Sequence, residues 1–253
     1  NMFKTAQQGV FQETEEDSAP ALAKSYNPKG EFWHRAWERK PVFFAILATV
    51  AILIGGVVEI VPTILVKSNV PTISSVKPYT ALELEGRDIY IKNGCVGCHS
   101  QMIRPFRFET ERYGEYSKAG EFVYDRPFLW GSKRTGPDLH RVGKKYPDSW
   151  HYFHMEDPRS MSPGSLMPPY PWLKTNELDY SDLPAKIRTM QKLGVPYPEG
   201  YDQQAVADLE AQAAGIATGL KDAGIAVMPN TEIVALIAYL QRLGTDIKVS
   251  SSN

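Results

Sequence analysis

The longest run of apolar residues in the chain extends from Phe43 to Val66. It spans 24 residues, contains one ionisable side chain, Glu59, and lacks the polar stripe that marks the exposed face of a soluble helix. About 20 apolar residues suffice to cross the hydrocarbon core of a bilayer. The pattern therefore predicts one transmembrane helix over residues 41–66. A cleaved signal peptide does not fit, because the run begins beyond residue 40 and is longer than an apolar signal core.

Basic residues on the two sides of this run predict its orientation. Those before it are Lys29, Arg35, Arg39 and Lys40, and those after it are Lys67 and Lys77. Because cytoplasmic flanks carry the excess of Lys and Arg, we expect the N-terminus in the cytoplasm and everything after residue 67 outside. Glu59 lies about 24 Å along the helix from Phe43, near the outer interface. There its carboxylate either reaches headgroup water or meets a partner helix or a proton path.

Beyond this run, apolar positions recur with helical spacing. Thr80 followed by Glu83 is a capping-box signature, which predicts a helix leading up to residue 95. Further helices are expected over 184–194, 202–221 and 232–243, the last capped by Asn230 or Thr231. No strand-rich region or repeat is evident. The fold class expected is mainly α, with a single N-terminal transmembrane helix followed by a domain in which the first and last helices cross.

Composition narrows the function classes. Hydrophobic residues make up 43% of the 253 residues and charged residues 23%, which excludes wholesale disorder. The formal net charge of −1 gives no general basic field for nucleic acid. Two cysteines exclude a disulfide-rich scaffold and an all-cysteine metal or iron–sulfur site.

The two cysteines stand in the sequence Cys95-Val96-Gly97-Cys98-His99, the attachment motif of c-type haem. Two thiols three residues apart on one turn reach the two vinyl groups of a porphyrin, and the next residue directs its imidazole at the iron. A thioredoxin-like pair would need a βαβ context, and a zinc site would need further ligands at suitable spacing. Covalent attachment takes place outside the bacterial cytoplasm, which agrees with the predicted orientation.

The sixth iron ligand is expected to be a methionine downstream of the haem helix, as is common in cytochromes c. Met167 is favoured because the stiff segment Pro168-Pro169-Tyr170-Pro171 follows it. The alternatives are Met161 and then Met155, or a second imidazole from His140, His151 or His154. The loop Thr135-Gly136-Pro137-Asp138-Leu139 matches the one that backs the proximal imidazole in class I cytochromes c. Its Pro137 carbonyl is predicted to accept the Nδ1 proton of His99.

Residues 43–248 resemble a known family. The runs GCVGCHSQMIRPFRFETERYGEYSKAGEFVYDRPFLWGSKRTGPDLHRVG and SLMPPYPWL, with IGGVVEIVP and KPYTALELEGRDIYI before them, are similar to the monohaem cytochrome c subunit (subunit II) of cbb3-type cytochrome c oxidases. The similarity includes long stretches unrelated to haem attachment. The first 40 residues fall outside it and are longer than the family's usual cytoplasmic tail.

The resemblance implies one covalent haem c in a bacterial inner-membrane complex that reduces oxygen and pumps protons. The chain would relay electrons from a dihaem cytochrome c subunit or a soluble cytochrome c to haem b of a separate catalytic haem–copper subunit. It also implies that Met167 is an axial ligand and that Ser132 approaches a calcium ion at the interface with the catalytic subunit. Apart from the resemblance, we include Arg141 among the haem-binding residues, as a candidate for a propionate or partner contact. Arg104, Arg107 and Arg134 are further candidates for propionate or partner contacts.

The expected organisation is a cytoplasmic extension (1–40), the membrane helix (41–66), a linker (67–79), a periplasmic monohaem domain (80–248) and a short tail (249–253). Three other functions stay open. They are the cytochrome subunit of a nitric oxide reductase, an independent membrane-tethered electron carrier, and a haem sensor or assembly factor. Metal analysis of the purified complex would distinguish the oxidase from the nitric oxide reductase. Copper would indicate the oxidase, and non-haem iron in its place would indicate the nitric oxide reductase.

Overall fold

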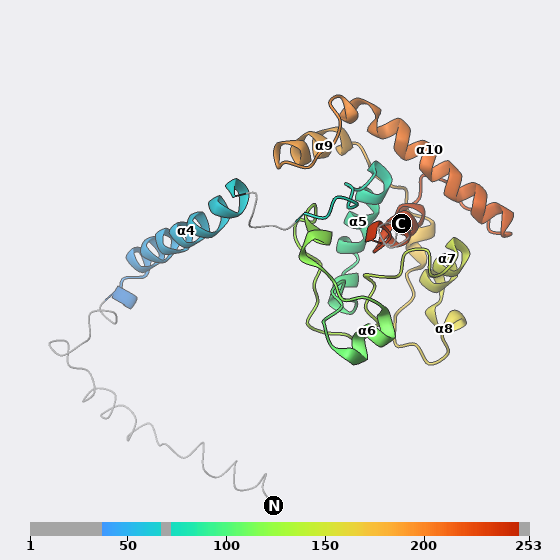
Figure 1. Cartoon of the computed structure of the whole chain (residues 1–253), viewed down its shortest axis with the longest axis horizontal. Helices are drawn as coiled ribbons and strands as arrows, with labels where there is room; N and C mark the ends of the chain where they lie inside the picture. Colours follow the sequence, from blue (N-terminus) through green and yellow to red (C-terminus); the bar gives the residue numbers. More distant parts are fainter. Residues whose placement is uncertain (1–36, 67–71, 248–253) are drawn as a thin grey trace, which may run out of the picture. The chain divides into compact units, whose positions relative to one another are not determined.

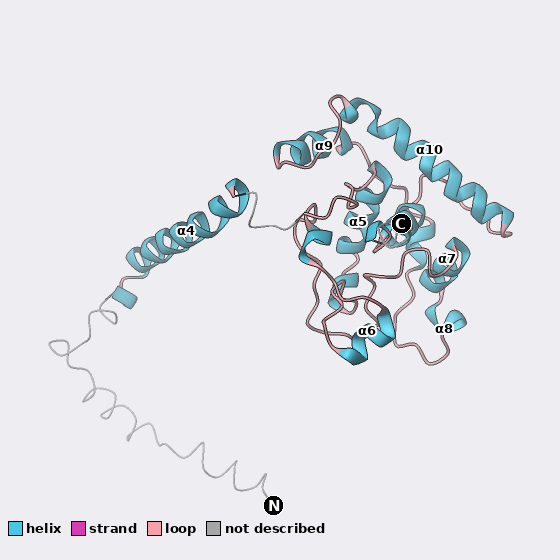
Figure 2. Ribbon diagram, viewed as in Figure 1, coloured by secondary structure: helices cyan, strands magenta, loops and turns pink. Residues whose placement is uncertain are grey.

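The computed structural model describes residues 37–66 and 72–247 and divides the chain into two units, residues 1–66 and 67–253 (Figure 1). Most of the expected N-terminal extension, the start of the linker and the C-terminal tail lie outside the described residues. Within the described ranges the regular elements are helices and there is no strand, apart from an isolated bridge between Glu177 and Thr231 (Figure 2). The prediction of a mainly α chain is confirmed.

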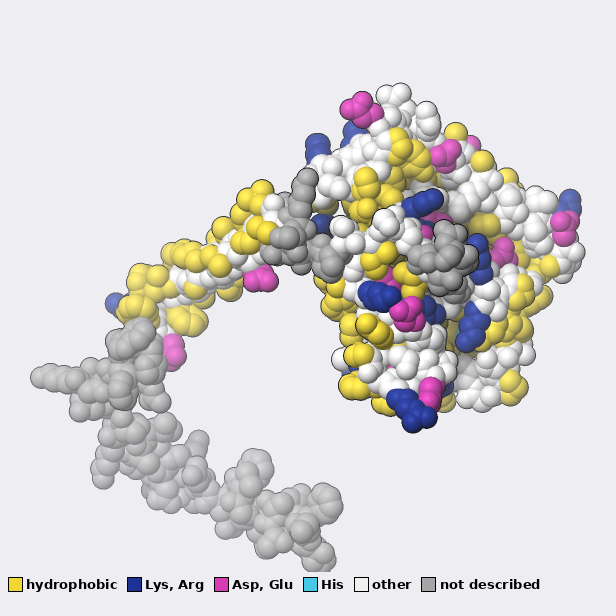
Figure 3. Space-filling model, viewed as in Figure 1, with side chains coloured by type: hydrophobic (Ala, Val, Ile, Leu, Met, Phe, Trp, Pro, Cys, Tyr) yellow, Lys and Arg dark blue, Asp and Glu magenta, His cyan; other side chains and the backbone are white. Residues whose placement is uncertain are grey.

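Helix α4 (Pro41–Leu65) is the single described helix long and apolar enough to cross a membrane. At 1.5 Å per residue its 25 residues extend about 37 Å. Most of its described apolar side chains are exposed, and they lie along its length in Figure 3. Two hydroxyls are satisfied within the helix: Thr49 donates to the Ala45 carbonyl and Thr63 to the Glu59 carbonyl, each at 2.8 Å. Burial of this surface therefore has to come from lipid or from another protein.

The second unit is built from short helices joined by long loops. The α-helices are α5 (Ala81–Lys92), α6 (Arg107–Tyr113), α7 (Asp148–Glu156), α8 (Pro158–Met161), α9 (Leu183–Lys192), α10 (Tyr201–Asp222) and α11 (Glu232–Arg242). The 3₁₀ turns are η2 (Cys95–Gly97), η3 (Ala119–Phe122) and η4 (Pro171–Lys174). Helices α9 and α10 pack on each other, and α10 packs on α5; both lie near the ranges expected for them. The sequence did not predict helices α6, α7 and α8.

The core of this unit is the contact between α5 and α11, as the sequence analysis expected of the first and last helices. Side chains on α11 from Ile233 to Leu240 are buried, and Tyr90 packs against Tyr239 with ring centroids 5.5 Å apart. The closest approach is at Gly86, where an added Cβ would lie 1.9 Å from the Ala235 carbonyl oxygen. Only glycine allows the two helices to approach this closely.

Helix α5 buries charged residues that no hydrophobic pattern reveals. Its capping box is present, with Thr80 accepting from the Glu83 N–H and Glu83 accepting from the Thr80 N–H. Arg87 donates through Nε to Asp125 at 2.8 Å, with both side chains less than a tenth exposed. Such pairs satisfy charges that would otherwise be costly to bury. Such pairs explain why charged residues interrupt the apolar positions of α5 although most of its side chains are buried.

We predict that Gly86→Ala destabilises the domain, because its methyl group would overlap the Ala235 carbonyl. Overpacking of this kind costs about 1–3 kcal/mol or more in the free energy of unfolding. The measurement is the thermal midpoint of the full-length chain in detergent.

Gly215→Ala on α10 is the matched control, because a Cβ there meets nothing within 4 Å. This substitution should be neutral or stabilise by about 0.5–1 kcal/mol through helix propensity. Equal stability of the two variants would contradict the close helix crossing.

Candidate haem site

A cavity of about 730 Å³ brings together the residues that the sequence analysis assigned to a haem. Cys95, Cys98 and His99 line it from the end of α5 and η2. The loop that follows residue 134, helix α7, the loop before η4 and one face of α11 complete the wall. The predicted residues Pro137, Arg141 and Met167 line the same cavity.

The backbone places the two cysteines at the cavity by ending α5 sharply. Gly94, with a φ of +69°, adopts the left-handed conformation that favours glycine and turns the chain into η2. Cys98 and His99 then both donate their N–H to the Cys95 carbonyl, at 3.1 and 2.9 Å. Cys95 is half-buried and Cys98 exposed, and both are free thiols. Cys98 is therefore the more accessible of the two cysteines that line the cavity.

The imidazole of His99 is held by the loop that the sequence analysis singled out. Its Nδ1 lies 2.8 Å from the Pro137 carbonyl oxygen, which can only accept, so Nδ1 carries the proton. Burial lowers the pKa of His99, which keeps the ring neutral. The lone pair of Nε2 is left for a metal. An added Cβ at Gly136 would lie 2.2 Å from the His99 ring, so this position requires glycine.

Further hydrogen bonds fix this loop against the haem motif. Tyr90 donates from its hydroxyl to the His99 carbonyl at 2.9 Å. The carboxylate of Asp138 accepts from the N–H groups of Met102 and His140, at 3.0 and 2.9 Å. Because Tyr90 belongs to the α5–α11 core, the position of His99 is tied to the packing of those helices.

The candidates for the sixth ligand separate by position. Met167, the favoured residue, lines the cavity, as do Met155, His151 and His154. Met161 and His140 do not line it. His140 lies instead against Glu121 and Phe122. The choice among the cavity-lining candidates stays a prediction.

Other candidate residues from the sequence lie elsewhere. Arg104 and Arg134 both bind the buried carboxylate of Glu109, and Arg107 pairs with Glu111 on the surface. None of these three arginines lines the cavity. Ser132 is exposed and does not line the cavity, so its contact with calcium stays a prediction.

Unpartnered polar atoms indicate that the cavity fits a group bearing acceptors. In the described part of the chain, five buried side-chain nitrogen or oxygen atoms lack a hydrogen-bond partner. Three of them belong to residues lining this cavity: Arg141 Nε, His151 Nε2 and His154 Nδ1. Burial lowers the pKa of His151 to about 4, so its ring is neutral at pH 7. The apolar wall, the two thiols and these nitrogens suit a porphyrin with its propionates.

Helix α7 and Tyr146, which precedes its N-cap Pro147, contribute an aromatic column that the sequence analysis overlooked. Tyr146 stacks on Trp150 at 4.1 Å between centroids, and Trp150 stacks on His154 at 4.5 Å. All three rings line the cavity. The sequence could have indicated part of this column, because Trp150 and His154 are four residues apart and such residues share one face of a helix.

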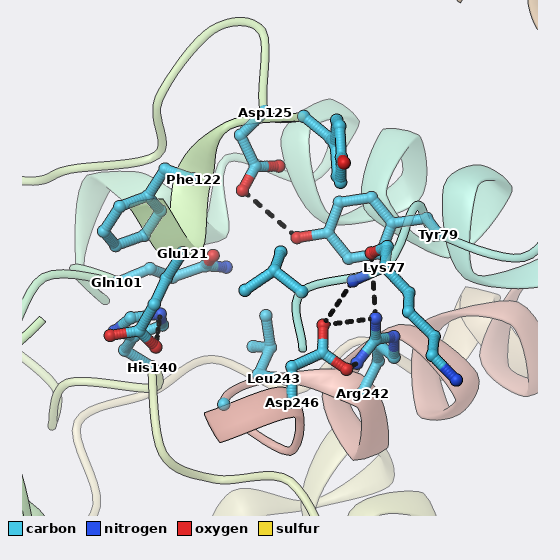
Figure 4. Close-up of a pocket in the computed structure, with 13 residues that line it drawn as sticks. Lys77, Tyr79, Gln101, Glu121, Phe122, Asp125, His140, Arg242, Leu243 and Asp246 are labelled. Atoms are coloured by element: carbon cyan, nitrogen blue, oxygen red, sulfur yellow. Dashed lines mark hydrogen bonds and ion pairs between the residues drawn. The ribbon is translucent and has the colours of Figure 1, made fainter. Parts of the chain in front are cut away.

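A second pocket, of about 40 Å³, contains none of the predicted haem-attachment residues (Figure 4). It is lined by ion-paired and hydrogen-bonded groups, among them Tyr79, which donates to Asp125 at 3.2 Å. Buried Gln101 lines it and leaves Nε2 unpartnered, while its Oε1 accepts from Tyr239. The larger cavity is therefore the candidate site.

Comparison with known families agrees with the sequence resemblance. The family model described as "Cytochrome C oxidase, mono-heme subunit/FixO" matches residues 34–247. A search of curated proteins gave no match. The match covers well over half of the chain and confirms the resemblance stated above. It begins at residue 34, so the expectation that the first 40 residues fall outside the family is wrong for residues 34–40.

We predict that Gly136→Ala displaces the His99 ring, since its methyl group would overlap that ring. The variant should accumulate with most of its haem high-spin or absent, as measured by optical spectra of the reduced and oxidised chain. Gly97→Ala, inside the motif but with open space around its Cβ, should keep the low-spin spectrum. A low-spin spectrum in both variants would contradict the placement of His99.

Proposed function

The chain belongs to the family of mono-haem cytochrome c oxidase subunits, and we propose that it relays electrons to the oxygen-reducing subunit through one covalently bound haem c. The donor would be a dihaem cytochrome c subunit or a soluble cytochrome c. The acceptor would be haem b of the catalytic haem–copper subunit. Oxygen reduction and proton pumping would occur in that other subunit.

The observation that carries this proposal is the single cavity lined by Cys95, Cys98, His99 and Met167. The two thiols would form thioethers with the porphyrin, and Nε2 of His99 would bind the iron. Met167 offers a thioether sulfur from a different part of the wall. The bound haem would supply reversible one-electron chemistry at iron.

The chain's own residues would set how readily the site accepts an electron. The Pro137 carbonyl fixes the orientation of His99 and increases the electron donation of its ring. A neutral methionine ligand and an apolar wall favour the reduced state and raise the potential. Arg141, through its unpartnered Nε, would bind a propionate.

The exposed Cys98 marks where electrons would enter or leave. Its sulfur would hold one porphyrin edge at the protein surface, while side chains of α7 and α11 would contact other parts of the ring. An edge that reaches the surface shortens the distance to a docked redox partner. The role of the protein would then be positioning and tuning rather than proton transfer.

We predict that Met167→Ala abolishes the weak charge-transfer band of Met-ligated ferric haem. It should lower the midpoint potential by a few tenths of a volt, since axial ligands shift haem potentials over about 0.8 V. Both are measured by potentiometric titration followed optically. Met161→Ala is the matched control, because Met161 does not line the cavity. An unchanged Met167→Ala spectrum would contradict Met167 as the sixth ligand. The candidates would then be Met155, His151 and His154, which also line the cavity.

We also propose that the haem domain lies on the outer face of the bacterial inner membrane, anchored by α4. Protease added to intact spheroplasts should then cut within residues 72–247, while an epitope placed before residue 41 stays protected. The fragments are followed by immunoblotting. Protection of the haem domain with loss of the epitope would reverse the orientation.

A further inference from the structure

Glu121 forms a buried ion pair with Arg141, which lines the haem cavity, but has itself no role in the function proposed so far. Arg141 donates through Nη1 to Glu121 Oε2 at 2.6 Å and through Nη2 to Glu121 Oε1 at 2.8 Å. The two side chains are 8% and 4% exposed. This is a bidentate pair, the geometry that fixes a guanidinium most tightly.

The pair uses one N–H of each Nη group of Arg141, and Nη1 also lies 3.0 Å from His140 Nδ1. Nη2 also donates to the Tyr116 carbonyl at 3.3 Å, whereas buried Nε has no partner in the described part of the chain. Arg141 lines the haem cavity, whereas Glu121 lines the smaller pocket of Figure 4. Arg141 therefore connects the Glu121 carboxylate to the wall of the haem cavity.

The surroundings keep both groups in place. Glu121 Oε1 also accepts the Lys118 N–H at 2.9 Å, which anchors the carboxylate at the start of η3. An added Cβ at Gly244 would lie 3.0 Å from Arg141 Cδ, so the aliphatic part of the arginine packs closely against this glycine. Burial, together with the charge of Arg141, lowers the pKa of the neighbouring His140. That ring is neutral, so Arg141 is the cationic partner of Glu121.

We propose that Glu121 is a positioning residue for the haem. By occupying the two Nη groups of Arg141, its carboxylate turns the remaining Nε–H toward the cavity, where a propionate accepts it. The proposal rests on the proposed function, because it requires a haem in this cavity. It adds a residue that touches neither the iron nor the porphyrin and that acts only through Arg141.

The experiment uses the full-length chain, matured with haem, and the propionate bending mode in its resonance Raman spectrum, which responds to hydrogen bonds on the carboxylate. Arg141→Gln should shift this mode. Glu121→Gln should shift it in the same direction, and the double variant should show no more than the Arg141→Gln shift. Asp125→Asn is the matched control, because it removes an equally buried carboxylate from the pair with Arg87 and should leave the mode unchanged.

A shift in Arg141→Gln with none in Glu121→Gln would overturn the positioning role, as would two shifts that simply add. Should Glu121→Gln fail to fold, Glu121→Asp replaces it, because the shorter carboxylate cannot keep both contacts. An unshifted mode in Arg141→Gln with the haem still covalently bound would remove the propionate contact but leave the electron relay intact. A chain without covalent haem would instead remove the proposed function itself.

Discussion

The hydrogen bond between His99 and the Pro137 carbonyl is the constraint on which the haem site depends. It sets the proton on Nδ1, fixes the ring plane and directs Nε2 into the cavity. The bond exists because Gly136 leaves room for the ring and because Asp138 ties the loop to the residues after the motif. The position of His99 itself follows from α5, whose packing on α11 at Gly86 fixes the end of that helix. Helix packing thus determines the orientation of one imidazole.

Much of the fold could be predicted from the sequence because its signals are local. The uninterrupted apolar run gives α4, the Thr80–Glu83 capping box gives the start of α5, and regular apolar spacing gives α10 and α11. The motif Cys95–His99 and the loop around Pro137 are likewise contiguous in sequence, so their chemistry could be read without a structure.

Other features could not be predicted because they depend on distant partners. The charged residues of α5 suggest an exposed helix face, yet Arg87 is buried and pairs with Asp125, 38 residues further along the chain. Arg104 and Arg134 are candidates for propionate or partner contacts in the sequence, which does not reveal that both pair with the buried carboxylate of Glu109. Helix α7 is short, and its aromatic and histidine side chains blur the hydrophobic pattern that would reveal it. In each case a contact across the fold overrides the local signal.

The central claim is that one haem is attached to Cys95 and Cys98 in this cavity. The most direct measurement is the mass of the chain after maturation in a host that attaches c-type haem, followed by complete denaturation and digestion. The account predicts one haem mass that survives denaturation and resides on the peptide containing both cysteines. A denatured chain of unmodified mass would contradict it.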